Sequence, residues 1–227
     1  MADRKGKKTV SAGSFAKALT KAEQRLLGRL DSPHEIQLFL DRLAYASETD
    51  YRSPLRVLHE RTCQCFDGAV FAAAMLSRLG HPPMVLNLLP NDRDDDHVLA
   101  LFRRDLHWGA VAKSNFVGLR FREPVYRDLR ELVMSYFEHY YNLHREKTLR
   151  GYTAPLSLES FDRLEWMTRD ETMDLIAGRL DAGRRYGILT KAMAARLSPV
   201  DLRSSEAGLH GANRAGISSP PARKRRG

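Results

Sequence analysis

The amino-acid sequence predicts an α+β fold, because helical patterns flank a central region that reads as strands. Apolar residues recur at helical spacing on both sides of this region, whereas residues 84–112 contain two apolar runs separated by turn signals. The chain has 227 residues, of which 43% are hydrophobic, and this is enough to bury one core of ordinary size. We therefore expect a single domain over residues 14–198 with helical extensions.

Basic residues gather at the two ends of the chain. Residues 1–10 contain four basic residues and one acidic residue, and residues 203–227 contain six and one, so the ends carry most of the net charge of +9. We expect basic disordered tails at residues 1–13 and 199–227, which would bind polyanions weakly. The nearly neutral body lacks the basic face expected of a domain that binds duplex nucleic acid.

The N-terminal third reads as helices. Phe15, Leu19 and Leu27 lie at near-helical spacing and predict one helix over residues 14–30. A second helix is predicted to begin at Ser32, because a serine cap followed by proline and then by Glu35 is typical of a capping box.

The central region combines one helix with a hairpin. Alanines at helical spacing predict a helix over residues 67–79 that packs closely on a neighbour and ends at Gly80. Strands are predicted at residues 84–89 and 97–102, and a turn at residues 103–106 would lead the second into a third strand at 107–112.

The C-terminal third predicts two more helices, one over residues 127–141 and one from a capping box at Thr168 and Glu171 to Leu180. No run approaches the roughly 18 apolar residues that span a bilayer, and no apolar segment follows the basic N-terminus as in a signal peptide. Two cysteines one residue apart would form a strained disulfide. We expect a protein of the reducing cytoplasm that does not enter a membrane.

Cys63 and Cys65 allow several interpretations. A zinc site would need a second pair of ligands at typical spacing, and none is present. The acidic run at residues 92–96 lacks the glycine and the terminal glutamate of a calcium-binding EF-hand loop, and it reads as a solvated loop. We therefore expect neither a metal nor a cofactor.

Cys65 is the candidate nucleophile, whereas Cys63 reads as a buried core residue. Cys65 falls at the start of the helix predicted over residues 67–79, where free N–H groups and the helix dipole would lower the thiol pKa below ~8.5. A cysteine nucleophile needs a base, and His97, at the start of a strand, is the best-placed histidine. The alternative is that His97 is only a polar strand end.

Three motifs resemble one family. They are C-x-D-x-A from Cys65, the helix exit MLSRLGHPPMV, and D-H-x-x-x-x-F from Asp96. In this order and spacing they resemble the transglutaminase-like superfamily over residues 54–115, and K-S-N at residues 113–115 is similar to a bacterial branch of it. The resemblance implies a papain-like α+β core, in which Cys65 and His97 convert a peptide or small amide into a thioester and pass the acyl group to water or an amine.

The superfamily usually has an aspartate on the strand after the histidine, and this sequence departs from that pattern. Pairing back from the predicted turn places His97 opposite Ala112, so that Ser114 shares its face. A one-residue bulge would bring Asn115 there instead. The site is therefore a triad with Asn115, a dyad supported by Ser114, or a decayed site.

The remaining candidates surround the pair. We expect Gln64, Asp67, Asp96, Trp108 and Lys113 to support the site or bind substrate. Asp67 also has a simpler interpretation, since an acidic residue in the first turn stabilises a helix by about 0.3–1 kcal/mol. Tyrosines 126, 136, 140 and 141 could line an acyl pocket or belong to the core.

Three classes of function follow from these observations. The first is a cysteine hydrolase or acyltransferase that acts on an amide. The second is a catalytically inactive interaction module that keeps the fold, which the missing aspartate favours. The third is a nucleic-acid-associated protein that uses its basic tails. The sequence leaves the oligomeric state open.

Overall fold

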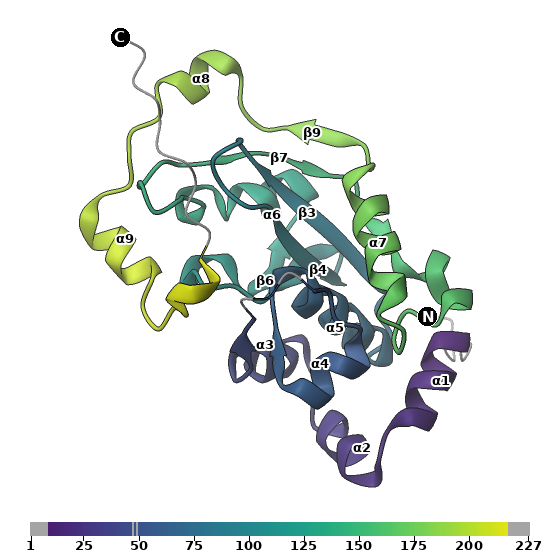
Figure 1. Ribbon diagram of the computed structural model, residues 1–227. Coiled ribbons are helices and arrows are strands. Elements are labelled where there is room, and N and C mark those ends of the chain that lie inside the picture. Colours follow the sequence, from purple (N-terminus) through teal and green to yellow (C-terminus); the bar gives the residue numbers. More distant parts are fainter. Residues whose placement is uncertain (1–8, 47, 49, 218–227) are drawn as a thin grey trace.

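The computed structural model describes residues 9–46, 48 and 50–217, and these residues form an α+β fold built on an antiparallel sheet (Figure 1). The α-helices, in chain order, are α1 (Val10–Ala18), α2 (Lys21–Gly28), α3 (Pro33–Asp41), α4 (Pro54–Glu60), α5 (Cys65–Arg78), α6 (Leu129–Met134), α7 (Glu171–Asp181), α8 (Lys191–Ala195) and α9 (Leu202–Gly208). Short 3-10 turns are η1 (Val117–Leu119), η2 (Phe137–His139), η3 (Leu158–Leu164) and η4 (Arg214–Gly216). The predicted fold class, α+β, is confirmed.

The main sheet has the strand order β6-β5-β4-β3-β7-β9, with β8 also paired to β3, and every pairing in it is antiparallel. Its strands are β3 (Met84–Pro90), β4 (His97–Arg104), β5 (His107–Val111), β6 (Arg122–Tyr126), β7 (Leu149–Thr153), β8 (Leu156–Ser157) and β9 (Arg185–Gly187). A separate parallel pair joins β1 (Ala44–Tyr45) to β2 (Thr62–Cys63) just before α5.

The sheet separates two apolar cores. Along β4, Val98, Ala100 and Phe102 face the core that contains α5, whereas Leu99 and Leu101 face the core that contains α6. This alternation follows from the two-residue period of a strand. Both faces of β4 are therefore buried, which explains why its sequence shows only weak alternation between apolar and polar residues.

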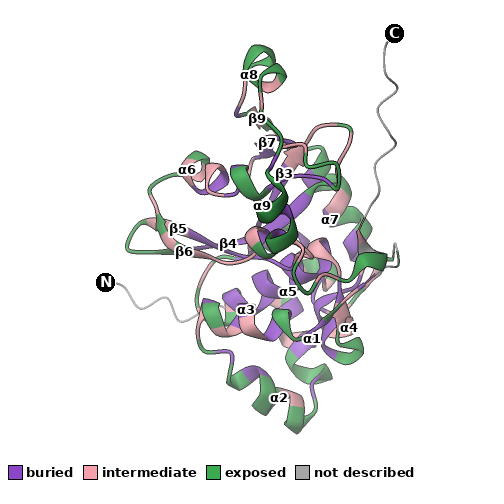
Figure 2. Ribbon diagram, turned by 90° about the vertical axis from the view of Figure 1, so that its left-hand side faces the viewer, coloured by how far each residue is buried: buried purple, intermediate pink, exposed green. Residues whose placement is uncertain are grey.

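Helix α5 is the most deeply buried helix of the site region, as the purple ribbon in Figure 2 shows. Residues 66–76 of α5 are all buried, and the helix packs against β4 and β3. Its alanines allow the helix backbone to approach the sheet closely, as the sequence predicted. Gly80, which follows the helix, has a φ of 89° that favours glycine.

The prediction of one continuous helix over residues 14–30 was wrong. The backbone is extended at Leu19 and Thr20, so that α1 and α2 are separate helices. Thr20 and Glu23 form a capping box that starts α2, because the threonine hydroxyl accepts the Glu23 N–H and the Glu23 carboxylate accepts the Thr20 N–H. A local cap thus interrupts a continuous apolar pattern. The helix predicted from Ser32 is confirmed, with Ser32 as its cap.

Two predictions in the C-terminal third need correction. The helix predicted over residues 127–141 is the short α6 followed by η2. Thr168 does not cap the next helix, because its hydroxyl donates to the Glu165 carbonyl and α7 begins three residues later. Strands β6 to β9 were not predicted, and two of them, β7 and β8, pair with β3 from a distant part of the chain.

Both predicted tails include residues that form helices in the structure. Helix α1 begins at Val10, whose N–H donates 2.7 Å to the Asp162 carboxylate. Helix α9 lies inside the segment 199–227, and the Tyr141 hydroxyl donates 3.0 Å to the Ser204 carbonyl. The remaining parts of the predicted tails, residues 1–8 and 218–227, lie outside the described residues. None of the helices described here has the length and apolar character needed to cross a membrane.

Candidate functional site

Cys65 is the first residue of α5, and its side chain is partly buried. The thiol Sγ lies 3.9 Å from the main-chain oxygen of Asp96, on the segment that leads into β4. Cys63 lies on β2 next to Tyr45, is fully buried, and has a pKa that burial raises to about 12. The interpretation of Cys63 as a core residue is therefore confirmed, and Cys65 is the cysteine that faces a pocket.

The hairpin β4–β5 brings His97 to the same place, but with a register that differs from the predicted one. The turn consists of Asp105 and Leu106, both with positive φ, and Arg104 pairs with His107. The prediction placed Phe102 opposite His107, whereas Phe102 pairs with Gly109. The two-residue loop lengthens both strands.

The side chain of His97 is buried and fixed by the main chain. Its Nε2 lies 2.7 Å from the Leu119 carbonyl, which can only accept a hydrogen bond, so Nε2 carries the proton. Within the described chain, Nδ1 has no hydrogen-bond partner and holds the free lone pair. Burial lowers the pKa of His97 to about 4, so the imidazole is neutral at pH 7. This histidine has the tautomer that a general base at Nδ1 requires.

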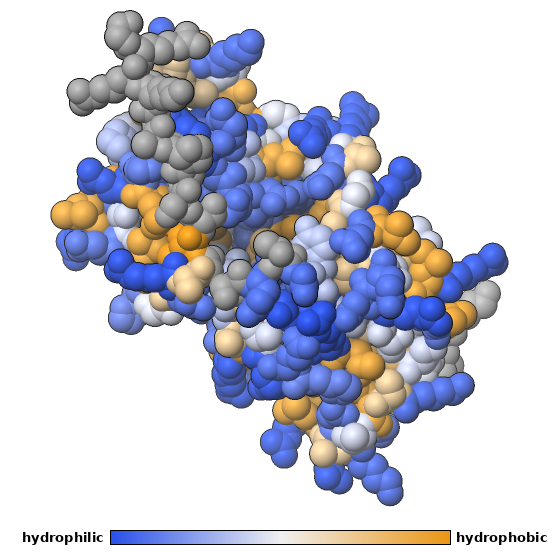
Figure 3. All heavy atoms as spheres, in the orientation of Figure 1, coloured by the Kyte–Doolittle hydropathy of each residue, from blue (hydrophilic) through white to orange (hydrophobic). Residues whose placement is uncertain are grey.

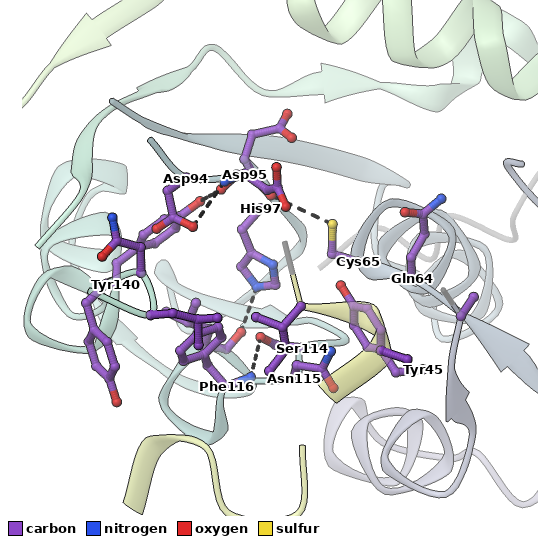
Figure 4. A pocket seen from close by; sticks show the side chains of 18 of the residues that line it. Tyr45, Gln64, Cys65, Asp94, Asp95, His97, Ser114, Asn115, Phe116 and Tyr140 are labelled. Carbon is purple, nitrogen blue, oxygen red and sulfur yellow. Dashed lines mark hydrogen bonds between the residues drawn. The ribbon is translucent and has the colours of Figure 1, made fainter. Parts of the chain in front are cut away.

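Cys65 and His97 line one pocket with a volume of about 450 Å³ (Figure 4). Figure 4 shows Cys65 from α5 and His97 from β4 in the same pocket. The Cys65 thiol points to the main-chain oxygen of Asp96, the residue before His97, and the imidazole points to the Leu119 carbonyl. The wall also contains Tyr45 of β1, Tyr140 after η2, and the acidic loop before β4. Six separate segments of the described chain thus line the pocket. The remaining lining residues are Ala46, Glu48, Gln64, Asp94, Asp95, Asp96, Ser114, Asn115, Phe116, Leu119, Tyr141, Asn142, Leu143, Ala215 and Ile217.

The thiol pKa differs from the prediction in its direction. Burial raises the pKa of Cys65 to about 12, and the Asp96 carboxylate acts in the same direction. Main-chain hydrogen bonds from Val98 and Phe66 oppose this rise without reversing it. The sequence predicted a pKa below ~8.5 from the helix N-terminus alone. The resting pair at pH 7 is therefore a neutral thiol beside a neutral imidazole.

The third position of the site also differs from the prediction. The Ser114 hydroxyl accepts the Phe116 N–H at 3.0 Å, and Asn115 exchanges hydrogen bonds with the main chain of Asn213 at 3.0 and 3.2 Å. Neither side chain holds Nε2 of His97, because the Leu119 carbonyl already occupies that position. Both residues do line the pocket, so they remain candidates for contact with a ligand.

Asp67 is fully buried and ties the start of α5 to the preceding loop. Its carboxylate accepts the Arg52 N–H at 2.9 Å and the Gln64 N–H at 3.2 Å, and it lies 3.7 Å from the Arg52 guanidinium. Burial raises the pKa of Asp67 to about 6. These contacts match the simpler interpretation of Asp67 as a residue that stabilises the helix start. Gln64 itself lines the pocket.

Lys113 and Trp108 do not line the pocket that contains Cys65. The Lys113 ammonium donates 2.8 Å to the Leu40 carbonyl and 2.5 Å to the Leu43 carbonyl, at the C-terminal end of α3. Trp108 packs under the guanidinium of Arg103 near the hairpin turn, 4.7 Å from ring centroid to Cζ. Lys113 therefore stabilises the fold beneath the pocket, and Trp108 lies at the far end of its strand.

Sequence reasoning missed two residues of the site. Tyr45 lines the pocket, and burial raises the pKa of its phenol. The Leu119 carbonyl holds His97. No sequence pattern indicates either residue. Tyr45 lies in a two-residue strand, and Leu119 acts through its main-chain oxygen. Tyr140 was considered, and it both lines the pocket and donates 2.7 Å to the Asp95 carbonyl.

The amino-acid sequence matches no family model and no curated protein. Among the described residues, no group of three or more His, Cys, Asp or Glu side chains is arranged to hold a metal ion. The resemblance to the transglutaminase-like superfamily therefore stands on the motifs of this chain and is carried forward as a proposal.

Proposed function

We propose that the protein is a transglutaminase-like cysteine hydrolase or acyltransferase that opens an amide bond of a peptide or small molecule through a thioester on Cys65. The observation that carries the proposal is the meeting of Cys65 and His97 in one pocket, with the free Nδ1 lone pair of His97. A cysteine at the start of a buried helix and a histidine at the start of a neighbouring antiparallel strand agree with the papain-like arrangement that the motifs imply.

In the first half of the reaction, Nδ1 of His97 takes the proton of the Cys65 thiol while sulfur attacks the amide carbon. The carbon–nitrogen bond then breaks, and the imidazolium returns the proton to the leaving amine. The Tyr45 hydroxyl and the Gln64 amide lie on the pocket wall and supply O–H and N–H donors for the developing oxyanion. Water or a second amine then attacks the thioester, which releases the acyl product and restores the thiol.

The hydrogen-bond acceptor of Nε2 in His97 is the Leu119 carbonyl and not the acid that the resemblance implies. A neutral carbonyl fixes the tautomer and orientation of His97, but it stabilises the transient imidazolium less than a carboxylate does. No carboxylate among the described residues hydrogen-bonds to His97. We therefore expect a slow enzyme whose resting pair is neutral, in which proton transfer accompanies attack.

The test is acylation by p-nitrophenyl acetate, a small neutral activated ester that makes no demand on charge selectivity. We expect a burst of nitrophenol and an acetyl group located on Cys65 by mass spectrometry. Cys65→Ala removes both, and His97→Gln slows acylation by about 10²-fold or more, the usual contribution of a general base. Cys63→Ala is the matched control and keeps the burst. Acylation that is equal in the Cys65 and Cys63 variants would overturn the proposal.

A specific observation favours a second candidate, the inactive interaction module. Burial raises the pKa of Cys65, and His97 faces a main-chain carbonyl instead of an acid. This candidate predicts no acyl-enzyme in the test above and a Cys65→Ala variant that keeps every binding activity of the wild type. The nucleic-acid hypothesis rests mainly on residues outside the described chain and is tested by the salt dependence of binding.

A further inference from the structure

The pocket at Cys65 has a negatively charged wall. Four carboxylates line it, those of Glu48, Asp94, Asp95 and Asp96, and its described wall contains no lysine or arginine. His97 does not compensate, because burial keeps it neutral. Clustered carboxylates in a recess raise the local concentration of cations.

Nearby cations do not neutralise this wall. The Arg52 guanidinium lies 3.1 Å from Glu48, so one of the four carboxylates is paired. Within the described ranges, no basic group lies within ion-pair distance of Asp94, Asp95 or Asp96, and the adjacent Arg93 pairs with Glu146 at 2.9 Å. The exposed carboxylate of Asp95 has no hydrogen-bond or ion-pair partner there. Three negative charges therefore face the pocket without a counter-charge.

A buried side chain gives a second, independent indication. Asn87 of β3 is 1% exposed, and its Nδ2 donates to the Asp96 carboxylate. That bond fixes the orientation of the amide and leaves Oδ1 as a buried acceptor with no partner among the described residues. Buried polar atoms are seldom left unpaired, since the cost is about 1–3 kcal/mol. Oδ1 of Asn87 thus lacks a donor directly beside the Asp96 carboxylate, and that carboxylate lines the pocket.

We propose that this pocket binds a cationic group of the acyl substrate, a lysine or arginine side chain of a basic peptide, beside the amide that Cys65 attacks. Ammonium and guanidinium groups bring positive charge and donate hydrogen bonds, which complements the carboxylates of the wall. This inference rests on the proposed function, because it names the substrate class of the same site. Most of the surface seen in Figure 3 is hydrophilic, with scattered hydrophobic patches.

Two sources can supply the cationic group that this pocket binds. One is a basic peptide from another molecule. The other is this chain, since Ala215 and Ile217 line the pocket and residues 223–226 have the sequence Arg-Lys-Arg-Arg. A segment attached to the rim of its own binding site acts at a high effective concentration, up to millimolar. The experiment below separates the two sources.

The test measures how the charge of a thiol reagent affects its rate at Cys65 in the full chain. The probes are a trimethylammonium-ethyl and a sulfonatoethyl methanethiosulfonate, with 2-mercaptoethanol as the reference thiol. We expect the ratio of the cationic to the anionic rate at Cys65 to exceed the reference ratio by about 10-fold or more. Asp95→Asn lowers this ratio, whereas Asp92→Asn, an exposed aspartate of the same loop outside the pocket, leaves it unchanged. A ratio equal to the reference overturns the inference.

A second measurement uses a peptide in place of a reagent. Acetyl-tetra-arginine amide is expected to protect Cys65 from iodoacetamide, and acetyl-tetraglutamate amide is not. Equal effects of the two peptides, or protection that survives Asp95→Asn, would contradict the inference. Changing the four basic residues at 223–226 to glutamine identifies the source. If this variant reacts faster with the cationic reagent, residues 223–226 occupy the pocket of the wild type. If its rate is unchanged, the pocket is open to an external peptide.

The two proposals fail separately. Acetylation of Cys65 by the neutral ester without charge selectivity would overturn only the cationic substrate. Charge selectivity without an acyl-enzyme would overturn only the enzymatic function and would leave a cation-binding pocket.

Discussion

Replacing His97 by glutamine tests whether the histidine is buried as a neutral base. Glutamine places an N–H donor near the position of Nε2, so the bond to Leu119 can persist, but it cannot take up a proton. The pKa of His97 falls from 6.5 to about 4 on burial. Because the unfolded chain binds the proton more tightly, the contribution of His97 to stability is complete above pH 6.5 and is lost as the pH falls to about 4.

The size of this effect follows from the two pKa values. At about 1.4 kcal/mol per pH unit, the wild type should lose about 3 kcal/mol of unfolding free energy between pH 6.5 and 4 that the variant does not lose. Urea unfolding of both proteins across this range measures the difference. Asp67 and Asp94 shift the opposite way, with pKa values of about 6, so only the comparison between proteins isolates His97.

Exposed His144 provides the control, since His144→Gln should follow the wild-type profile. Parallel pH profiles for wild type and His97→Gln would refute the reasoning. They would mean that His97 can be protonated in the folded protein as easily as in water, and a neutral base at pH 7 would then need another explanation.

Two further predictions concern the frame of the site. Lys113→Met leaves the Leu40 and Leu43 carbonyls without their buried donor and should lower the free energy of unfolding by about 2–4 kcal/mol, measured in urea, whereas exposed Lys17→Met should change it by less than about 0.5 kcal/mol. Gly80→Ala meets no atom within 4 Å but forces a side chain into a backbone with φ of 89°, and it should cost about 1–2 kcal/mol in the same assay; no change would show that the turn relaxes.

Local signals predicted the parts of the fold that local contacts determine. Ser32 caps α3 through the Glu35 N–H, and a run of small residues ending at Gly80 defined α5. Cys65 and His97 were found because each stands at the boundary of an element with a clear pattern, and the resemblance supplied the pairing. The order of strands β3, β4 and β5 followed from their proximity in the chain.

The errors arose where distant or main-chain contacts decide. The hairpin register depends on the positive φ of Leu106 in the turn. Leucine rarely adopts this conformation, so the residue type does not indicate it. The acceptor that holds His97 is the backbone of Leu119, which any residue would provide. The raised pKa of Cys65 depends on burial by the whole fold, whereas the sequence indicated only the helix N-terminus.

The pH dependence of iodoacetamide alkylation at Cys65, resolved by mass spectrometry, tests the nucleophile–base pair most directly. In a neutral pair the fraction in which His97 holds the thiol proton does not change with pH between the two pKa values, about 4 and about 12. We predict a wild-type rate that levels off to a pH-independent value as the pH falls toward about 5, because there attack assisted by neutral His97 exceeds the reaction of free thiolate. The His97→Gln rate is lower there and keeps falling about tenfold per pH unit. A wild-type rate that rises with pH in the same way as the variant's would contradict the pairing of Cys65 with His97.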